Sequence, residues 1–120
     1  KPFEAAIRQG GIRAVMNSYS EWEGRPVCAS RALLTDLLRN QLGFDGVVVS
    51  DYRSIQRLLD DILAVSPDIA SAALECLQAG LDMELPDRLG YADDLVQMFR
   101  DGRADVTWLD RAALRVLTLK

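Results

Sequence analysis

The amino-acid sequence predicts an α/β fold made of three parallel βα units and a further C-terminal helix. Two observations support this prediction. Short apolar runs alternate along the chain with longer segments of helical periodicity, which is the pattern of parallel βα units. The run Val47-Val48-Val49 is apolar on both faces, and Gly46 and Ser50 bound it. Such a run is typical of a parallel strand buried on both sides.

The first βα unit is expected within residues 1–42. A short helix is expected over residues 2–9, because Phe3, Ala6 and Ile7 share one face and Gly10-Gly11 follows as a stop. Residues 12–18 read as a strand that ends near Asn17. Residues 19–29 read as a loop. Ser30 can cap a helix that runs to about residue 42, where leucines recur at helical spacing before Gly43.

The remaining elements follow in the same order. The buried strand covers residues 46–50, and a helical turn is expected within residues 52–66. Ser66-Pro67-Asp68 is a strong helix start, with Ser66 as the hydroxyl cap, and Gly80 is the matching stop. A third strand is predicted over residues 81–85. Two amphipathic helices, residues 91–100 and 108–119, complete the chain, and Asp105 or Thr107 caps the second.

Composition excludes several functional classes. The chain has 120 residues, 49% of them hydrophobic, a formal charge of −4 and no histidine. With no basic stripe and no run of about 18 apolar residues, neither a nucleic-acid partner nor a membrane span is expected. Without histidine, Ser-His-Asp and Cys-His catalytic systems are impossible within this chain. We expect no metal site and no cofactor, so the chemistry depends on carboxylates.

Asp51 is the first carboxylate to consider. It directly follows the buried strand and precedes Tyr52, and parallel strands carry functional groups at their carboxyl ends. From the residues alone, a structural cap or turn is as reasonable a role as catalysis. Asp82 and Glu84 look like a second pair on the third predicted strand, but we expect a structural role for Asp82 and no catalytic role for Glu84.

Five ordered blocks extend this pattern to a family. They are Val15-Met16-Asn17-Ser18-Tyr19-Ser20, Gly24-x-Pro26, Leu33-Leu34-Thr35-Asp36-Leu37-Leu38-Arg39, Gly43-Phe44-Asp45-Gly46-Val47-Val48-Val49-Ser50-Asp51-Tyr52 and Ala79-Gly80-Leu81-Asp82-Met83-Glu84-Leu85-Pro86. In order and spacing they resemble glycoside hydrolase family 3, whose members include β-glucosidases and β-xylosidases. The resemblance covers nearly all of the chain.

The resemblance implies that residues 1–120 are a single segment, the last third of the family's N-terminal (β/α)8 barrel. The fold would then be a partial TIM barrel. It also implies a retaining β-glycosidase that acts on β-linked oligosaccharides or glycosides, of the β-glucoside or β-xyloside type, with Asp51 as the catalytic nucleophile. Met16, Tyr19, Tyr52 and Arg57 take the places of substrate-binding residues, and Tyr52 borders the leaving-group side.

The acid/base carboxylate would come from outside this segment, commonly from a following domain, so the segment alone is expected to be inactive. One departure from the family favours a second hypothesis. Family members with a Ser-Asp-Tyr sequence often carry a histidine where residues 59–65 here have none. A catalytically silent barrel relic, acting as a sugar-binding or interaction domain, is therefore the alternative.

Overall fold

Two parallel strands lie at the centre of the computed structural model, which describes residues 1–60 and 65–120. β1 (Ala14–Met16) pairs with β4 (Val47–Val49), and Val15 lies opposite Val48. The strands approach closely at Gly46, where an added Cβ would overlap the carbonyl oxygen of Arg13. This close approach requires glycine directly before the strand that ends at Asp51.

The third predicted strand, residues 81–85, is wrong in its extent: the structure has a single parallel bridge there, between Val49 and Met83. Side chains replace the next ladder bonds on each side. The Val48 amide and the Leu81 carbonyl do not bond to each other. The Val48 amide donates to the Asp82 carboxylate (2.9 Å), and the Leu81 carbonyl accepts from the Tyr91 hydroxyl (2.7 Å). On the other side, the amide of Leu85 donates to the Ser50 hydroxyl (2.8 Å). The segment follows β4 without forming a regular strand.

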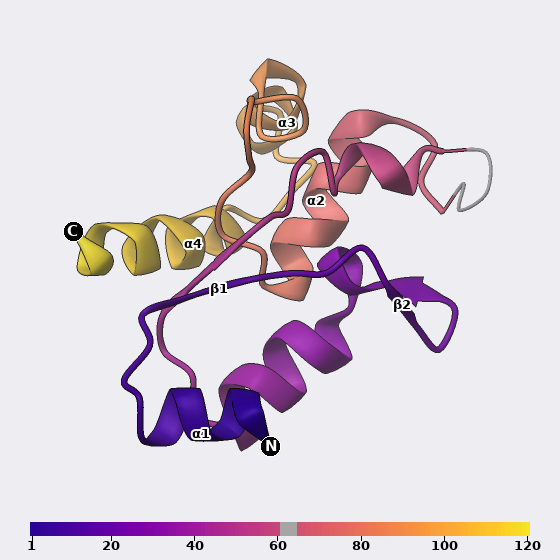
Figure 1. Ribbon diagram of the computed structural model, residues 1–120. Coiled ribbons are helices and arrows are strands. Elements are labelled where there is room, and N and C mark those ends of the chain that lie inside the picture. Colours follow the sequence, from indigo (N-terminus) through magenta and orange to yellow (C-terminus); the bar gives the residue numbers. More distant parts are fainter. Residues whose placement is uncertain (61–64) are drawn as a thin grey trace.

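Two helices, α1 (Pro2–Arg8) and η2 (Ala32–Gln41), lie on one side of β1, and α3 (Asp93–Arg100) lies on the other (Figure 1). The predicted helix after Ser30 is present, but η2 has π-helical hydrogen bonds, such as that from the amide of Leu42 to the Leu37 carbonyl (3.0 Å). The Ser30 hydroxyl accepts from the amide of Leu33 at 3.4 Å, as a cap does.

The predicted loop over residues 19–29 contains a small hairpin. β2 (Glu21–Trp22) pairs antiparallel with β3 (Arg25–Pro26), and the 3-10 turn η1 (Val27–Ala29) follows. Glu23 and Gly24 both have positive φ, 52° and 74°. Two such residues between paired strands make the tight hairpin turn that matches strand twist.

Helix α2 (Ile69–Ala79) packs against η1, α3 and α4 (Val106–Leu119). Asp68, not the predicted Ser66, caps it by accepting from the amide of Ser71 (2.8 Å), while the Ser66 hydroxyl donates to Glu75 (2.6 Å). Gly80 ends the helix at φ 116°, as predicted. The helical turn predicted within residues 52–66 is present as η3 (Gln56–Leu58), and its predicted continuation lies partly outside the described residues.

The last two helices agree with the sequence pattern. α3 (Asp93–Arg100) begins two residues later than predicted, and α4 (Val106–Leu119) begins two residues earlier. Asp105 is the cap of α4, because its carboxylate accepts from the amide of Thr107 at 3.0 Å. No helix within residues 1–60 and 65–120 has both the length and the apolar composition needed to cross a membrane.

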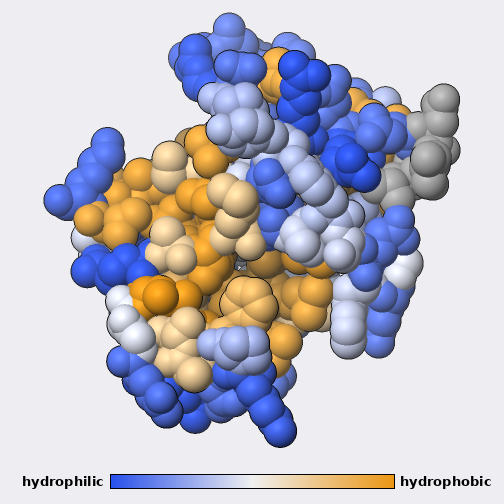
Figure 2. Space-filling view, in the orientation of Figure 1, coloured by the Kyte–Doolittle hydropathy of each residue, from blue (hydrophilic) through white to orange (hydrophobic). Residues whose placement is uncertain are grey.

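The core lies where β4, α2 and the segment after Asp51 meet. Val48, Ile55, Leu58, Cys76 and Leu81 are fully buried there. Outside this core a broad apolar area remains on the face where β1 passes between α1 and α4 (Figure 2). The exposed side chains of these elements include Phe3, Met16, Leu114 and Leu117.

Candidate active site

Asp51 lies at the carboxyl end of β4, half-buried and at the molecular surface. Its carboxylate oxygen Oδ1 accepts from the amide of Tyr52 at 2.7 Å. Its carbonyl accepts from the amide of Ser54 (3.2 Å) and from the Ser54 hydroxyl (2.9 Å). The backbone around Asp51 is thus held in a tight turn directly after the rigid strand, which fixes the direction of the carboxylate.

Asn17 supports this turn from the neighbouring strand. It follows β1 and is 5% exposed. Its side-chain oxygen accepts from the amide of Asp51 (3.2 Å), and its side-chain nitrogen donates to the Ser54 hydroxyl (3.1 Å). A buried amide with both ends paired specifies a single geometry. Asn17 therefore ties the end of β1 to the turn that carries Asp51.

The structure brings three predicted site residues together beside Asp51. The Tyr19 hydroxyl donates to the Tyr52 carbonyl at 2.7 Å, and the Arg57 guanidinium lies over the Tyr19 ring, 4.8 Å from its centre. These three residues line one cleft of about 390 Å³ with Arg53, Gln56 and Asp60. This volume is within the range of small-molecule sites.

The titration behaviour of Tyr19 also links it to Asp51. The pKa of Tyr19 lies above its usual value, first because its hydroxyl is partly removed from water and second because the nearby Asp51 carboxylate disfavours the phenolate. The positive charge of Arg57 lowers the pKa of Tyr19 in part. Tyr19 therefore stays a neutral hydrogen-bond donor at neutral pH, next to the candidate nucleophile.

Met16 does not join this cleft. It is 51% exposed and lines a separate apolar groove of about 300 Å³ with Phe3, Leu33 and Leu37. Within the described structure, Met16 is thus an exposed apolar side chain at the end of β1, at the same edge of the sheet as Asp51.

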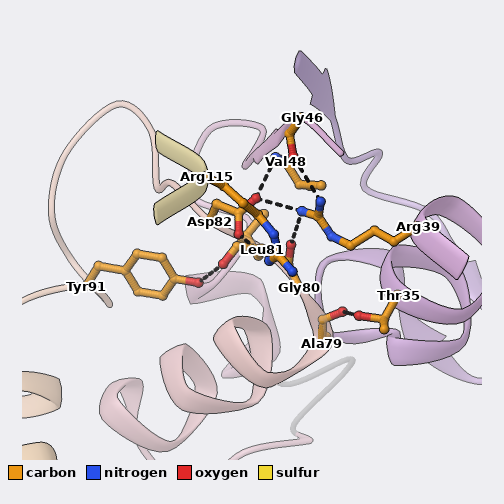
Figure 3. Close-up of polar contacts among 10 residues, drawn as sticks. All are labelled: Thr35, Arg39, Gly46, Val48, Ala79, Gly80, Leu81, Asp82, Tyr91 and Arg115. Carbon is orange, nitrogen blue, oxygen red and sulfur yellow. Dashed lines mark hydrogen bonds and ion pairs between the residues drawn. The ribbon is translucent and has the colours of Figure 1, made fainter. Parts of the chain in front are cut away.

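A buried ion cluster lies near the start of β4, away from Asp51 at the other end of the strand (Figure 3). The Asp82 side chain is 1% exposed and binds Arg39 at 2.7 Å and Arg115 at 2.8 Å. Arg39 also donates to the carbonyls of Gly46 (2.9 Å) and Gly80 (3.3 Å). Because Asp82 also accepts from Val48, the cluster joins η2 and α4 to the start and the middle of β4. The structural role predicted for Asp82 is confirmed.

Burial shifts the pKa values of two members of this region. Desolvation lowers the pKa of Arg39, although the carboxylate of Asp82 raises it in part. Burial raises the pKa of Tyr91 well above its usual range, so its hydroxyl stays protonated and donates to Leu81. These shifts accompany structural hydrogen bonds and lie away from the cleft beside Asp51.

Glu84 has a structural role as well. Its carboxylate accepts from the amides of Leu89 (3.1 Å), Gly90 (2.9 Å) and Tyr91 (2.8 Å). It therefore fixes the loop before α3, as the sequence predicted for a non-catalytic carboxylate. Residues 1–60 and 65–120 hold no cluster of three or more His, Cys, Asp or Glu side chains suited to a metal ion.

Two supporting residues, Asn17 and Ser54, were not predicted as site residues. The signal for Asn17 is present in the sequence, since a polar residue ends an apolar strand at the edge where Asp51 lies. Ser54 offers no comparable signal, because its role depends on the turn after β4.

Comparisons with known proteins place the chain in a family. Residues 1–119 match the family model of the glycosyl hydrolase family 3 N terminal domain. The chain is 34% identical to a beta-xylosidase of Formosa agariphila over 99% of its own length, and 34% identical to a beta-glucosidase of Rhizobium radiobacter over 98%. It superimposes on a β-glucosidase structure from Erythrobacter marinus with a TM-score of 0.91 and 39% identity over 98% of the chain.

The chain spans only part of each of these proteins: 17% of the Formosa protein, 13% of the Rhizobium protein and 15% of the Erythrobacter chain. Within that part the agreement extends from one end of the chain to the other. The protein therefore belongs to glycoside hydrolase family 3, through the N-terminal domain of that family.

Proposed function

We propose that this chain supplies the catalytic nucleophile, Asp51, of a retaining β-glycosidase that hydrolyses β-glucosides or β-xylosides. The observation that carries the proposal is the position of Asp51. It is a half-buried carboxylate at the carboxyl end of a central strand, held by Asn17 and Ser54 beside a cleft of tyrosines and arginines. The β-xylosidase and β-glucosidase names of the relatives support the substrate class.

The proposed reaction has two displacement steps. In the first, a carboxylate oxygen of Asp51 attacks the anomeric carbon and forms a covalent glycosyl ester. The bond from that carbon to the leaving oxygen breaks, and an acid group outside this chain protonates that oxygen. In the second, water attacks the same carbon, the acid group accepts a proton as base, and the Asp51 carboxylate is released. Two inversions give net retention.

We propose that the chain works as one segment, residues 1–120, of a longer protein. The N-terminal domain of the family is a TIM barrel, and β1, β4 and the segment bridged at Met83 would be its last three strands. The rest of the barrel and a following domain would then supply the acid/base group and the other walls of the sugar site. The roles of Met16, Tyr19, Tyr52 and Arg57 as substrate-binding residues belong to the same proposal.

External nucleophile rescue in the complete protein tests the role of Asp51. Asp51→Gly should lower kcat on a 2,4-dinitrophenyl β-glycoside by roughly 10⁴–10⁶-fold, because the covalent step is lost. Sodium azide should fill the space left by the carboxylate, restore turnover and give the α-glycosyl azide. Product configuration is read by proton NMR.

Asp60→Gly is the matched control, because it removes a carboxylate from the adjacent cleft and should give no glycosyl azide. Retained hydrolysis by Asp51→Gly without azide would contradict the assignment. A wild-type protein that binds glycosides but hydrolyses none would favour the catalytically silent alternative.

A further inference from the structure

The lining of the cleft beside Asp51 holds more arginines than carboxylates, although the chain as a whole is acidic. The chain carries a formal charge of −4, yet the cleft is lined by two arginines, Arg53 and Arg57, and one carboxylate, Asp60. Its remaining lining comes from Tyr19, Tyr52 and Gln56, which are uncharged. The two arginines are therefore the groups of this cleft that attract an anionic ligand, and Asp60 and the neighbouring Asp51 offset part of their charge.

The backbone of Arg53 is held in an uncommon conformation. Its φ is 58°, in the left-handed region that residues other than glycine rarely adopt. The amide of Arg53 donates to the Leu85 carbonyl at 3.1 Å, and the following residue, Ser54, is bonded twice to the Asp51 carbonyl. The same turn that holds the candidate nucleophile therefore fixes the position of Arg53. Strained residues of this kind gather at ligand sites.

Arg57 lies one turn further along the same segment, where its amide donates to the Arg53 carbonyl at 3.2 Å. Its guanidinium lies over the ring of Tyr19, which is itself fixed by the hydrogen bond to Tyr52. Stacking on a ring leaves the planar edge of a guanidinium free to bind a carboxylate with two parallel hydrogen bonds. Within residues 1–60 and 65–120, neither Arg53 nor Arg57 forms an ion pair, although Asp60 lines the same cleft.

We propose that this cleft recognises a carboxylate on the leaving group of the substrate. The inference rests on the proposed function, because it uses Asp51 as nucleophile and Tyr52 as the border of the leaving-group side. The ligand class is a β-glycoside whose aglycone carries a carboxylate a few ångströms beyond the glycosidic oxygen, either an aromatic acid or an acidic sugar. Tyr19 and Tyr52 offer it apolar surface, while Arg53 and Arg57 bind its charge.

A matched pair of substrates tests this recognition in the complete protein. The pair is 4-(carboxymethyl)phenyl and 4-(carbamoylmethyl)phenyl β-glucoside, with the same pair of β-xylosides run in parallel. The methylene group separates the charge from the phenol, so the two leaving groups depart with similar ease. We expect kcat/KM for the carboxylate to exceed that for the amide by about tenfold, as a charge-assisted contact implies.

The ratio of the two kcat/KM values is then measured in variants. Arg53→Gln and Arg57→Gln should each reduce the ratio to about threefold, and the double variant should bring it to about one. Arg100→Gln is the matched control, since it removes an exposed arginine that does not line the cleft, and its ratio should equal that of the wild type. Added salt should lower the wild-type ratio, because the contact is partly exposed.

The outcomes separate this inference from the proposed function. Equal kcat/KM values for both substrates, or a preference that survives in the double variant, would overturn the carboxylate site while glycoside hydrolysis stands. If no glycoside is hydrolysed, the proposed function fails. Saturation-transfer NMR then compares binding of 4-hydroxyphenylacetate and 4-hydroxyphenylacetamide and tests the carboxylate site without turnover. Binding of the acid alone, lost in Arg53→Gln, would support the site, and equal signals would overturn it.

Discussion

Asp82 shows how one residue can hold a strand in place. Its carboxylate binds two guanidiniums and a backbone amide while its side chain is 1% exposed. A buried ion is stable only when its partners compensate for lost hydration, and removal of one partner leaves the others unpaired. Loss of the Asp82 carboxylate should therefore destabilise the contacts of β4 with η2 and α4.

Asp82→Asn should lower the free energy of unfolding of the complete protein by about 3–5 kcal/mol, because the buried Arg39 and the partly buried Arg115 lose their counter-charge. Asp36→Asn is the matched control. Asp36 forms an exposed ion pair with Arg31 at 3.9 Å, and such pairs contribute about 0–1 kcal/mol. Urea unfolding of both variants measures the difference. Equal losses in the two variants would show that the cluster is not structurally important.

At the level of single residues, the sequence singles out Asp51 as the candidate nucleophile, which stays a prediction, and it predicts the structural role of Asp82. It did not predict the partners of Asp82. Arg39 and Arg115 lie 43 and 33 residues away from Asp82, and one of them is on a helix whose pattern predicts only an amphipathic surface. Partners that meet through tertiary packing leave no local signal. Likewise, no local signal shows that Met16 lines a different hollow from Tyr19 and Tyr52.

At the level of elements, β4 and the main helices follow directly from apolar periodicity and helix stops. The third strand was mispredicted because its ladder bonds go to the side chains of Asp82 and Ser50, which no β-propensity describes. The hairpin over residues 21–26 was missed because its strands are only two residues long. The cap of α2 was placed at Ser66 instead of Asp68 since Ser and Asp are both preferred caps.

The Asp68 cap gives a pH-dependent prediction for α2. Hydrogen bonds from Ser71 lower the pKa of Asp68 below its ordinary value of 3.8. A carboxyl whose pKa is lowered by folding stabilises the folded state above its unfolded pKa, and this stabilisation is lost as the pH falls through the folded pKa. The native protein should therefore melt at a higher temperature than Asp68→Asn at pH 7, and the gap should close below pH 3.8.

Asp93→Asn is the control for this prediction, because Asp93 lies in the first turn of α3 without forming a side-chain cap. Its melting temperature should differ less from that of the native protein at pH 7. A gap for Asp68→Asn that stays constant down to pH 2 would contradict the assigned cap.

At the level of the whole molecule, the described chain keeps apolar surface and unpaired strand edges. Within the described residues, β1 pairs on one side only, and Phe3, Leu114 and Leu117 are each about two-thirds exposed. Strand edges and apolar faces of this kind are normally covered by further structure. The proposal that neighbouring barrel units cover them agrees with the fraction of the relatives that the chain spans, 13% to 17% for the two curated proteins.

The most direct test of the central claim is covalent trapping in the complete protein. A 2-deoxy-2-fluoro β-glycoside with an activated leaving group forms the glycosyl ester and hydrolyses it slowly, so the nucleophile stays labelled. Peptide mapping by mass spectrometry should find the label on Asp51, and none should form in Asp51→Gly. A label on Asp60, Asp82 or Glu84 would contradict the account.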